Sequence, residues 1–290
     1  MHGKRYCICT AAYPQAALRI QQYADALAAL LGAREDACAL VVAEAGMTMP
    51  AALRDIRRIE WVSSQASAPA PLRGAMLEMA RGVAAEWLLF VDFDDRIKPG
   101  AADLWDRLSS EIQIGYADLD LIDSEGEALG RLMFGHLPDT LVARDLEAAN
   151  CLGFSNTALN RQALNAEDCN VPDGLIAVDW WLFSRLLQRG IAAGRIDGVV
   201  ADYRQYDGNQ LGADEAGDAS AIERRVTALE AHYRALNNGG WLNRIKKLRD
   251  TPDWPKALLR HQPADGAARW WFQSLTASIG DLTAHAEKAM

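Results

Sequence analysis

The feature that most constrains this sequence is an apolar run at residues 87–91 (WLLFV) that continues directly into Asp92, Asp94 and Asp95. A short run without polar positions is typical of a strand that is buried on both faces. Carboxylates are costly to bury without a partner. We therefore expect the strand to end at a solvated cleft, with the three aspartates at its rim.

Three carboxylates at one strand end indicate a divalent cation. Oxygen ligands suit magnesium or manganese, and a cation held by one or two carboxylates keeps coordination positions for substrate phosphates. The sequence thus predicts a metal site at Asp92, Asp94 and Asp95 and a phosphate-bearing substrate. The alternative is a structural turn, because aspartate is also common in helix caps.

Composition excludes several classes of protein. The chain has 290 residues, of which 50% are hydrophobic and 24% charged, as in a soluble globular protein with a sizeable core. A net charge of -9 argues against a nucleic-acid binder, which needs a basic surface. The 5 cysteines match no zinc or redox spacing, so we expect reduced thiols and a cytoplasmic protein. No apolar run is long enough for a signal peptide or a membrane span.

Strand and helix patterns alternate along the first part of the chain. The expected strands are 6–10, 38–43, 59–63 and 87–91, and the expected helices are 14–31, 50–58, 72–85 and 99–110. This order predicts an α/β fold with a mostly parallel sheet and helices on both faces. Ligands of such sheets bind beyond the carboxyl ends of the strands, where the aspartates fall.

The second half adds a hairpin, one apolar helix and a charged tail. A strand at 112–122 precedes a turn at 124–127, and its Asp118 and Asp120 are interpreted as a solvated strand face. The helix at 177–188 has Asp179 in its first turn and ends before Gly190. Long charged helices from residue 213 predict a compact domain at 1–212 and a helical C-terminal extension at 213–290.

Four segments in order resemble motifs of the family 2 glycosyltransferases of the GT-A fold, of the bacterial surface-polysaccharide type. The aspartates resemble the DxD motif, and 178–182 (VDWWL) with 185–190 (RLLQRG) resembles the helix that supplies the catalytic base. Residues 203–212 (YRQYDGNQLG) are similar to the closing motif, and 153–161 (GFSNTALNR) to the segment before the base. The likeness covers residues 4–212.

The resemblance implies an inverting, metal-dependent hexosyl- or deoxyhexosyltransferase. The sugar would move from a nucleotide-diphosphate donor to a hydroxyl of a glycan or lipid-linked acceptor, with manganese or magnesium as cofactor. A carboxylate acting as general base contributes about 10² to 10⁴ in rate. The implied roles are Asp179 as base, Asp92, Asp94 and Asp95 for the metal, Glu44, Arg73 and Arg204 for the donor, and Trp180 and Trp181 for the acceptor.

The sequence departs from the family pattern at two positions. Tyr206 stands where the closing motif commonly has a histidine, and the second strand ends in Glu44 where paired aspartates are common. The nucleotide, the sugar and the acceptor are therefore left open. A non-catalytic nucleotide-sugar or glycan-binding protein of the same fold is an alternative. A magnesium-dependent phosphatase of the haloacid dehalogenase type is another, although Arg96 replaces the small hydroxyl residue that family needs.

Structural roles also remain open for several of these residues. Asp179 can stabilise a helix N-terminus, Trp180 and Trp181 can be core residues, and Arg204 can be a surface ion-pair partner. In the tail, residues 241–249 (WLNRIKKLR) combine an apolar face with basic residues, and aromatic residues recur at 269–272. This pattern fits peripheral contact with the inner membrane face, and it equally fits packing on the catalytic domain or on a second subunit of a homo-oligomer.

Overall fold

The computed structural model describes residues 4–14, 19–206, 218–261 and 270–288. Its centre is one sheet of ten strands, in the order β3-β2-β1-β4-β9-β6-β10-β5, with β7 beside β6 and β8 beside β10. The strands are β1 (Lys4–Ala12), β2 (Ala37–Ala43), β3 (Ile59–Ser63), β4 (Ala85–Phe90), β5 (Arg96–Ile97), β6 (Ile114–Ile122), β7 (Ala128–Leu132), β8 (Thr140–Leu141), β9 (Thr157–Asn160) and β10 (Ala193–Arg204).

All the longer strands except the β7 hairpin arm run in one direction. Strands β3, β2, β1 and β4 pair in parallel, as do β6 and β10. The short β9 lies between β4 and β6 and is antiparallel to both, so these two strands point the same way without touching. The mostly parallel α/β sheet expected from the sequence is thus confirmed.

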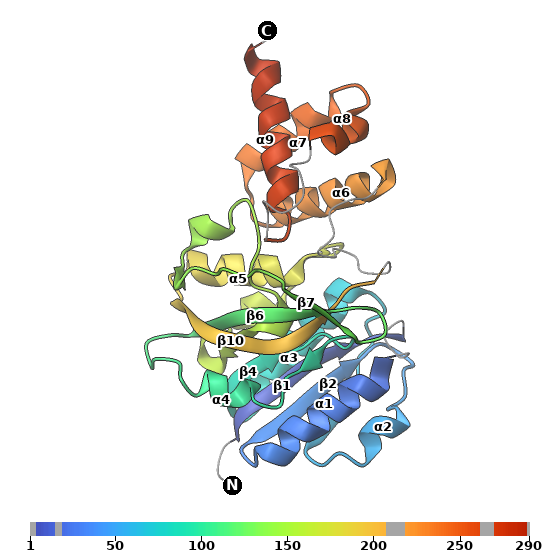
Figure 1. Ribbon diagram of the computed structural model, residues 1–290, viewed down its shortest axis with the longest axis vertical. Coiled ribbons are helices and arrows are strands. Elements are labelled where there is room, and N and C mark those ends of the chain that lie inside the picture. The colour runs from blue at the N-terminus through green and yellow to red at the C-terminus, as the bar shows by residue number, and fades with distance from the viewer. Residues whose placement is uncertain (1–3, 15–18, 207–217, 262–269, 289–290) are drawn as a thin grey trace.

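Helices cover both faces of the sheet, and α6 to α9 form a separate layer beyond α5 (Figure 1). Side chains alternate along β1: Cys7 and Cys9 join the core under α3 and α5, and Tyr6 and Ile8 join the core under α1, α2 and α4. The helices are α1 (Ile20–Ala33), α2 (Ala51–Arg54), α3 (Pro69–Gly82), α4 (Ala101–Trp105), α5 (Val178–Gln188), α6 (Ala219–Ala235), α7 (Gly239–Arg249), α8 (Trp254–His261) and α9 (Gln273–Lys288).

Most elements expected in the first half are present, with shorter helices. The strand at 59–63 has the predicted bounds, whereas the helices expected at 50–58 and 99–110 are reduced to α2 and α4. Part of the helix expected at 14–31 lies outside the described residues. The sequence did not indicate β5, β8, β9 or β10, because these segments are very short or, in β10, interrupted by glycine and charged residues.

The C-terminal helices pack on the rest of the molecule through aromatic residues. Trp180 of α5 stacks on His232 of α6 at 3.8 Å between ring centroids, and Tyr233 stacks on Trp241 of α7 at 5.0 Å. The apolar face of α7 is therefore buried, and its basic residues point outward. The packing alternative accounts for the apolar residues of 241–249 without a membrane. The boundary expected at residue 212 lies outside the described residues.

Two smaller expectations can be compared with the structure. The five cysteines are free, and four of them are buried. Within the described parts of the chain, none of the helices has the length and apolar character needed to cross a lipid bilayer.

Candidate active site

A cavity of about 430 Å³ opens at the carboxyl ends of the parallel strands. Tyr13 follows β1, Glu44 follows β2, and Asp92 and Asp94 follow β4, and all four line it. The first turn of α5 contributes Asp179 to the same cavity. The structure therefore brings most of the predicted site residues to one place, which is the edge where parallel sheets bind ligands.

Arg73 of α3 lies between two carboxylates of this cavity. Its Nη2 is 2.9 Å from Asp92 Oδ1, and its charge also acts on Asp179. The guanidinium carbon is 5.3 Å from the ring centroid of Phe154. Arginine is suited to this position, because its planar group can stack on a ring and bond a carboxylate at the same time.

Asp179 is held in the first turn of α5, where Trp180 N donates to its Oδ1 at 2.8 Å. Burial raises the pKa of the Asp179 carboxyl to about 6, against the opposing effects of Arg73 and the Trp180 N–H. Burial also raises the pKa of Asp92, again opposed by Arg73. A carboxylate with a pKa near 6 is ionised at neutral pH and can accept a proton from a substrate.

Asp94 is bonded to two tyrosines. Tyr13 Oη donates to Asp94 Oδ1 at 3.1 Å, and Tyr206 Oη donates to Asp94 Oδ2 at 2.6 Å. Burial and the charge of Asp94 raise the pKa of both phenols, which therefore stay protonated as donors. Arg19 lies over the Tyr206 ring, 4.1 Å from its centroid. Tyr206 stands where the closing motif of family 2 glycosyltransferases commonly has histidine, and its hydroxyl group is hydrogen-bonded directly to Asp94.

Asp95 differs from the other two aspartates. It is 2% exposed and accepts from Ser155 Oγ at 2.5 Å and from Arg204 N at 2.9 Å. Burial raises its pKa, with the charges of Asp94 and Asp92 adding to the effect. Asp95 does not line the cavity, because it points into the protein and fixes the ends of β4 and β10 to the segment at 153–156.

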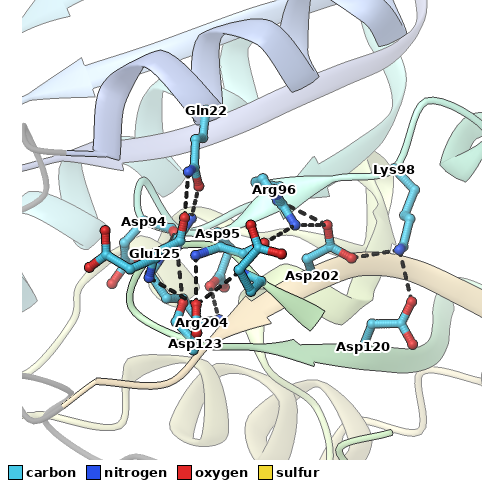
Figure 2. A network of polar contacts seen from close by, with 12 residues as sticks. Gln22, Asp94, Asp95, Arg96, Lys98, Asp120, Asp123, Glu125, Asp202 and Arg204 are labelled. Atoms are coloured by element: carbon cyan, nitrogen blue, oxygen red, sulfur yellow. Dashed lines mark hydrogen bonds and ion pairs between the residues drawn. The ribbon is translucent and has the colours of Figure 1, made fainter. Parts of the chain in front are cut away.

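Arg204 lines the cavity, as the donor-binding prediction required, but its guanidinium is bonded within the protein. It is 1% exposed, and its guanidinium donates to the carbonyl oxygens of Asp94, Asp123 and Ser124 and to Gln22 Oε1. Figure 2 shows this network at the end of β10, where the arginine ties together the aspartate loop, the β6–β7 turn and α1. Because these acceptors occupy its N–H groups, Arg204 fixes the loops around the cavity and does not present a pair of N–H donors to phosphate oxygens.

The tryptophans predicted for the acceptor do not line the cavity. Trp180 is 0% exposed, and its Nε1 donates to the Leu146 carbonyl oxygen at 2.8 Å, while Trp181 is 2% exposed. Both rings point from α5 into the core because most of that helix is buried. The positions of Trp180 and Trp181 therefore match the prediction that they are core residues, and they do not match the prediction that they bind the acceptor.

The second pair of aspartates has the structural role expected for it. Asp118 accepts hydrogen bonds from the backbone of Leu119, Phe134 and Gly135, and Asp120 pairs with Lys98 at 2.8 Å. Neither aspartate lines the cavity. In Figure 2 the Asp120–Lys98 pair stands apart from the aspartates that follow β4.

The donor set of the cavity fits a divalent cation that takes most of its ligands from a substrate. Among the residues that the structure describes, no three acidic, histidine or cysteine side chains form a closed metal cage. Asp94 and Asp92 both face the cavity, and one or two carboxylates suffice when phosphate oxygens complete the coordination. Asp95 is excluded from such a site because it is buried and does not line the cavity.

Sequence reasoning missed several residues of the cavity wall. Tyr13, Trp271 and Phe272 lie in none of the motifs, and Ser155 and Tyr203 lie in motif segments but were given no role of their own. Trp271 and Phe272 reach the site from the C-terminal extension, although their pattern resembled an exposed aromatic cluster. Of the closing motif only 203–206 is described, since 207–212 lies outside the described residues.

Solved structures with the same architecture are known. TarS (residues 1–349) from S. aureus aligns with a TM-score of 0.54 at 15% identity over 88% of this chain and 79% of TarS. Its complex with UDP-GlcNAc aligns equally well, at 16% identity. The mannosyltransferase PcManGT from Pyrobaculum calidifontis, in complex with GDP-Man and Mn²⁺, aligns with a TM-score of 0.54 at 16% identity over 100% of this chain and 81% of that one.

The chain shares the fold of these proteins. At these identities the likeness concerns the α/β architecture with its mostly parallel sheet, and not the individual side chains. No protein-family model and no curated protein sequence matches the chain. The chemistry of this GT-A-like fold must therefore be argued from the cavity itself.

Proposed function

We propose that the protein is an inverting glycosyltransferase, which moves a hexosyl or deoxyhexosyl group from a nucleotide-diphosphate sugar to a hydroxyl of a glycan or lipid-linked acceptor. The observation that carries this proposal is that Asp179, with a pKa near 6, lines the same cavity as Asp92 and Asp94, which follow β4. Two proteins of the same fold support it, since TarS binds UDP-GlcNAc and the mannosyltransferase binds GDP-Man.

Asp179 is proposed to take the proton of the acceptor hydroxyl as its oxygen attacks the anomeric carbon. The bond from that carbon to the donor diphosphate breaks in the same displacement, so the anomeric configuration inverts and no covalent intermediate forms. Arg73 holds Asp92 and lowers the cost of gathering negative charge in the cavity. A manganese or magnesium ion bound by Asp94 and Asp92 would supply further positive charge beside the leaving diphosphate.

The test is nucleotide release from a panel of nucleotide sugars, measured with manganese in the presence and absence of EDTA. We expect release for at least one donor, a loss of at least about 100-fold in Asp179→Asn, and a loss on chelation. Asp173→Asn is the matched control, because Asp173 is an exposed aspartate in the loop before α5 and does not line the cavity. Binding of a donor without release or transfer, for every donor, would instead favour a nucleotide-sugar-binding protein.

A further inference from the structure

The C-terminal extension is joined to the cavity by one short strand-like contact. Trp271 and Asn150 exchange two backbone hydrogen bonds, with N···O distances of 2.9 and 3.0 Å. One turn later, Thr276 Oγ1 donates to the Ala148 carbonyl oxygen at 2.6 Å. The start of α9 is thereby fixed to the loop that leads into the cavity segment at 153–156.

The indole of Trp271 is held on three sides. It meets the ring of Phe134 edge-on at 5.0 Å and that of Tyr203 at 5.7 Å between centroids. On the third side lies Gly153, where a Cβ atom would come within 2.8 Å of Trp271 Cη2. These contacts fix the ring in place. Trp271 is 8% exposed, and it lines the cavity.

The backbone turns at Phe272, so that Trp271 and Phe272 make contacts with different parts of the protein. Its φ of 67° lies in the left-handed region, which is unfavourable for a bulky side chain and is kept only where packing enforces it. Phe272 stacks on Trp180 of α5 at 5.1 Å, while Trp271 lies against Tyr203. Both residues line the cavity.

The lining of the cavity contains two chemically different groups of residues. Arg73, Asp92 and Asp94 form a charged group, and Trp271, Phe272 and Ile176 form an apolar one. A nucleotide diphosphate would require the charged group, because Arg73 is there and Asp92 and Asp94 would hold its cation. Trp271 contacts Tyr203, and the charge of Asp179 acts on that same tyrosine, so the indole lies in the part of the cavity near Asp179. A flat indole fits the apolar C–H face of a sugar ring.

We propose that Trp271, with Phe272, forms the acceptor subsite and that its ligand is a pyranose ring of a glycan acceptor. This inference rests on the proposed function for its chemical meaning, since Asp179 must then lie beside the bound hydroxyl. The C-terminal extension thus supplies part of the active site instead of only covering α5.

The experiment measures binding of p-nitrophenyl glycosides of glucose, galactose and N-acetylglucosamine by saturation-transfer NMR, in the presence of UDP or GDP and manganese. We expect at least one glycoside to bind, with a dissociation constant raised at least tenfold in Trp271→Ala and two- to threefold in Trp271→Phe, which keeps a ring. Gly153→Ala should weaken binding as well, because its Cβ displaces the indole. Circular dichroism checks that each variant is folded.

Trp270→Ala is the matched control, because Trp270 is the neighbouring tryptophan and does not line the cavity. Affinity for UDP or GDP, measured by calorimetry, should be the same in wild type, Trp271→Phe and Trp270→Ala. The subsite proposal is overturned if no glycoside binds, if Trp270→Ala weakens glycoside binding as much as Trp271→Ala, or if Trp271→Phe weakens nucleotide binding. Glycoside binding that depends on Trp271, in a protein without transfer from any donor, would keep the subsite and remove the proposed transferase.

Discussion

At the scale of single residues, the cavity depends on how its buried carboxylates are neutralised. Arg73 forms an ion pair with Asp92, and its charge acts on Asp179 at longer range. Two tyrosine hydroxyl groups donate hydrogen bonds to Asp94. Burial in this region raises the pKa of Asp92 and Asp179, and each partner offsets part of that effect. Substitution of a partner residue such as Arg73 should therefore shift the pKa of the neighbouring aspartates, although the aspartates themselves are unchanged.

The first prediction concerns the pH dependence of sugar transfer. Because Asp179 must be ionised to act as a base and its pKa is about 6, kcat/KM should rise about tenfold per pH unit below 6 and level off above it. A pH series with a fixed donor and acceptor measures this profile. A flat profile from pH 5 to 7 would show that another group accepts the proton.

The second prediction concerns Arg73→Gln. Loss of the guanidinium removes an interaction that lowers the pKa of Asp179, so the acidic limb of the pH profile should move to higher pH. The variant should also lose about 1 to 3 kcal/mol of unfolding free energy, because Asp92 is left without its partner. Arg81→Gln on the same helix is the control, since its exposed pair with Glu78 is worth little. An unchanged limb in Arg73→Gln contradicts the assignment.

At the scale of secondary-structure elements, the site depends on where β10 ends. The last residue of β10 is Arg204, whose backbone and side chain bond Asp95, the aspartate loop and the β6–β7 turn (Figure 2). Glycine and charged residues interrupt the apolar positions of the strand, so it was not apparent from periodicity. Its position follows from pairing with β6 over most of its length, a long-range contact that local patterns do not record.

The third prediction separates the two roles of Arg204. Arg204→Lys keeps the charge but cannot reproduce four buried hydrogen bonds, so thermal denaturation should show a loss of about 3 kcal/mol or more. Arg224→Lys on the exposed side of α6 should change stability by less than about 0.5 kcal/mol. Weaker nucleotide binding at unchanged stability would restore the phosphate-binding interpretation.

The fourth prediction concerns the junction between α5 and α6. Burial lowers the pKa of His232 to about 3, so the folded protein keeps it neutral while the unfolded chain takes up a proton below about pH 6.5. This residue should therefore remove up to about 1.4 kcal/mol of stability per pH unit as the pH falls from 6.5. Denaturant titrations at pH 5 and 7 should show a smaller acid loss in His232→Phe than in wild type, and an unchanged loss in His136→Phe, where the histidine is exposed.

At the scale of the whole molecule, the α/β sheet could be predicted from the sequence and the C-terminal half of the site could not. The run at 87–91 identified β4, and the aspartates after it lie at the cavity as expected. The resemblance in motif order assigned Asp179 to the same site, and Asp179 lines the cavity as well. The sequence could not assign Trp271 to the site, because its neighbours in space, Phe134 and Tyr203, are distant in sequence. The different positions of Asp94 and Asp95 depend on Ser155 and Arg204, which local patterns do not connect.

The fifth prediction is that residues 1–212 do not form an independent native domain. Without α6 and Phe272, the face of α5 that carries Trp180 is left uncovered, and the cavity loses Trp271. The truncated chain should aggregate or lack near-ultraviolet circular dichroism, in contrast to the full chain. Sharp, dispersed NMR signals from residues 1–212 would instead show that the extension is dispensable for folding.

The position of β9 has a consequence for how a ribosome must produce this protein. Strands β4 and β6 are separated by a strand that is encoded after both of them. A nascent chain that has emerged only as far as β6 therefore has one edge of β4 and both edges of β6 unpaired, and other chains can add to such edges. Translation that stalls before residue 160 should leave a product that requires a chaperone.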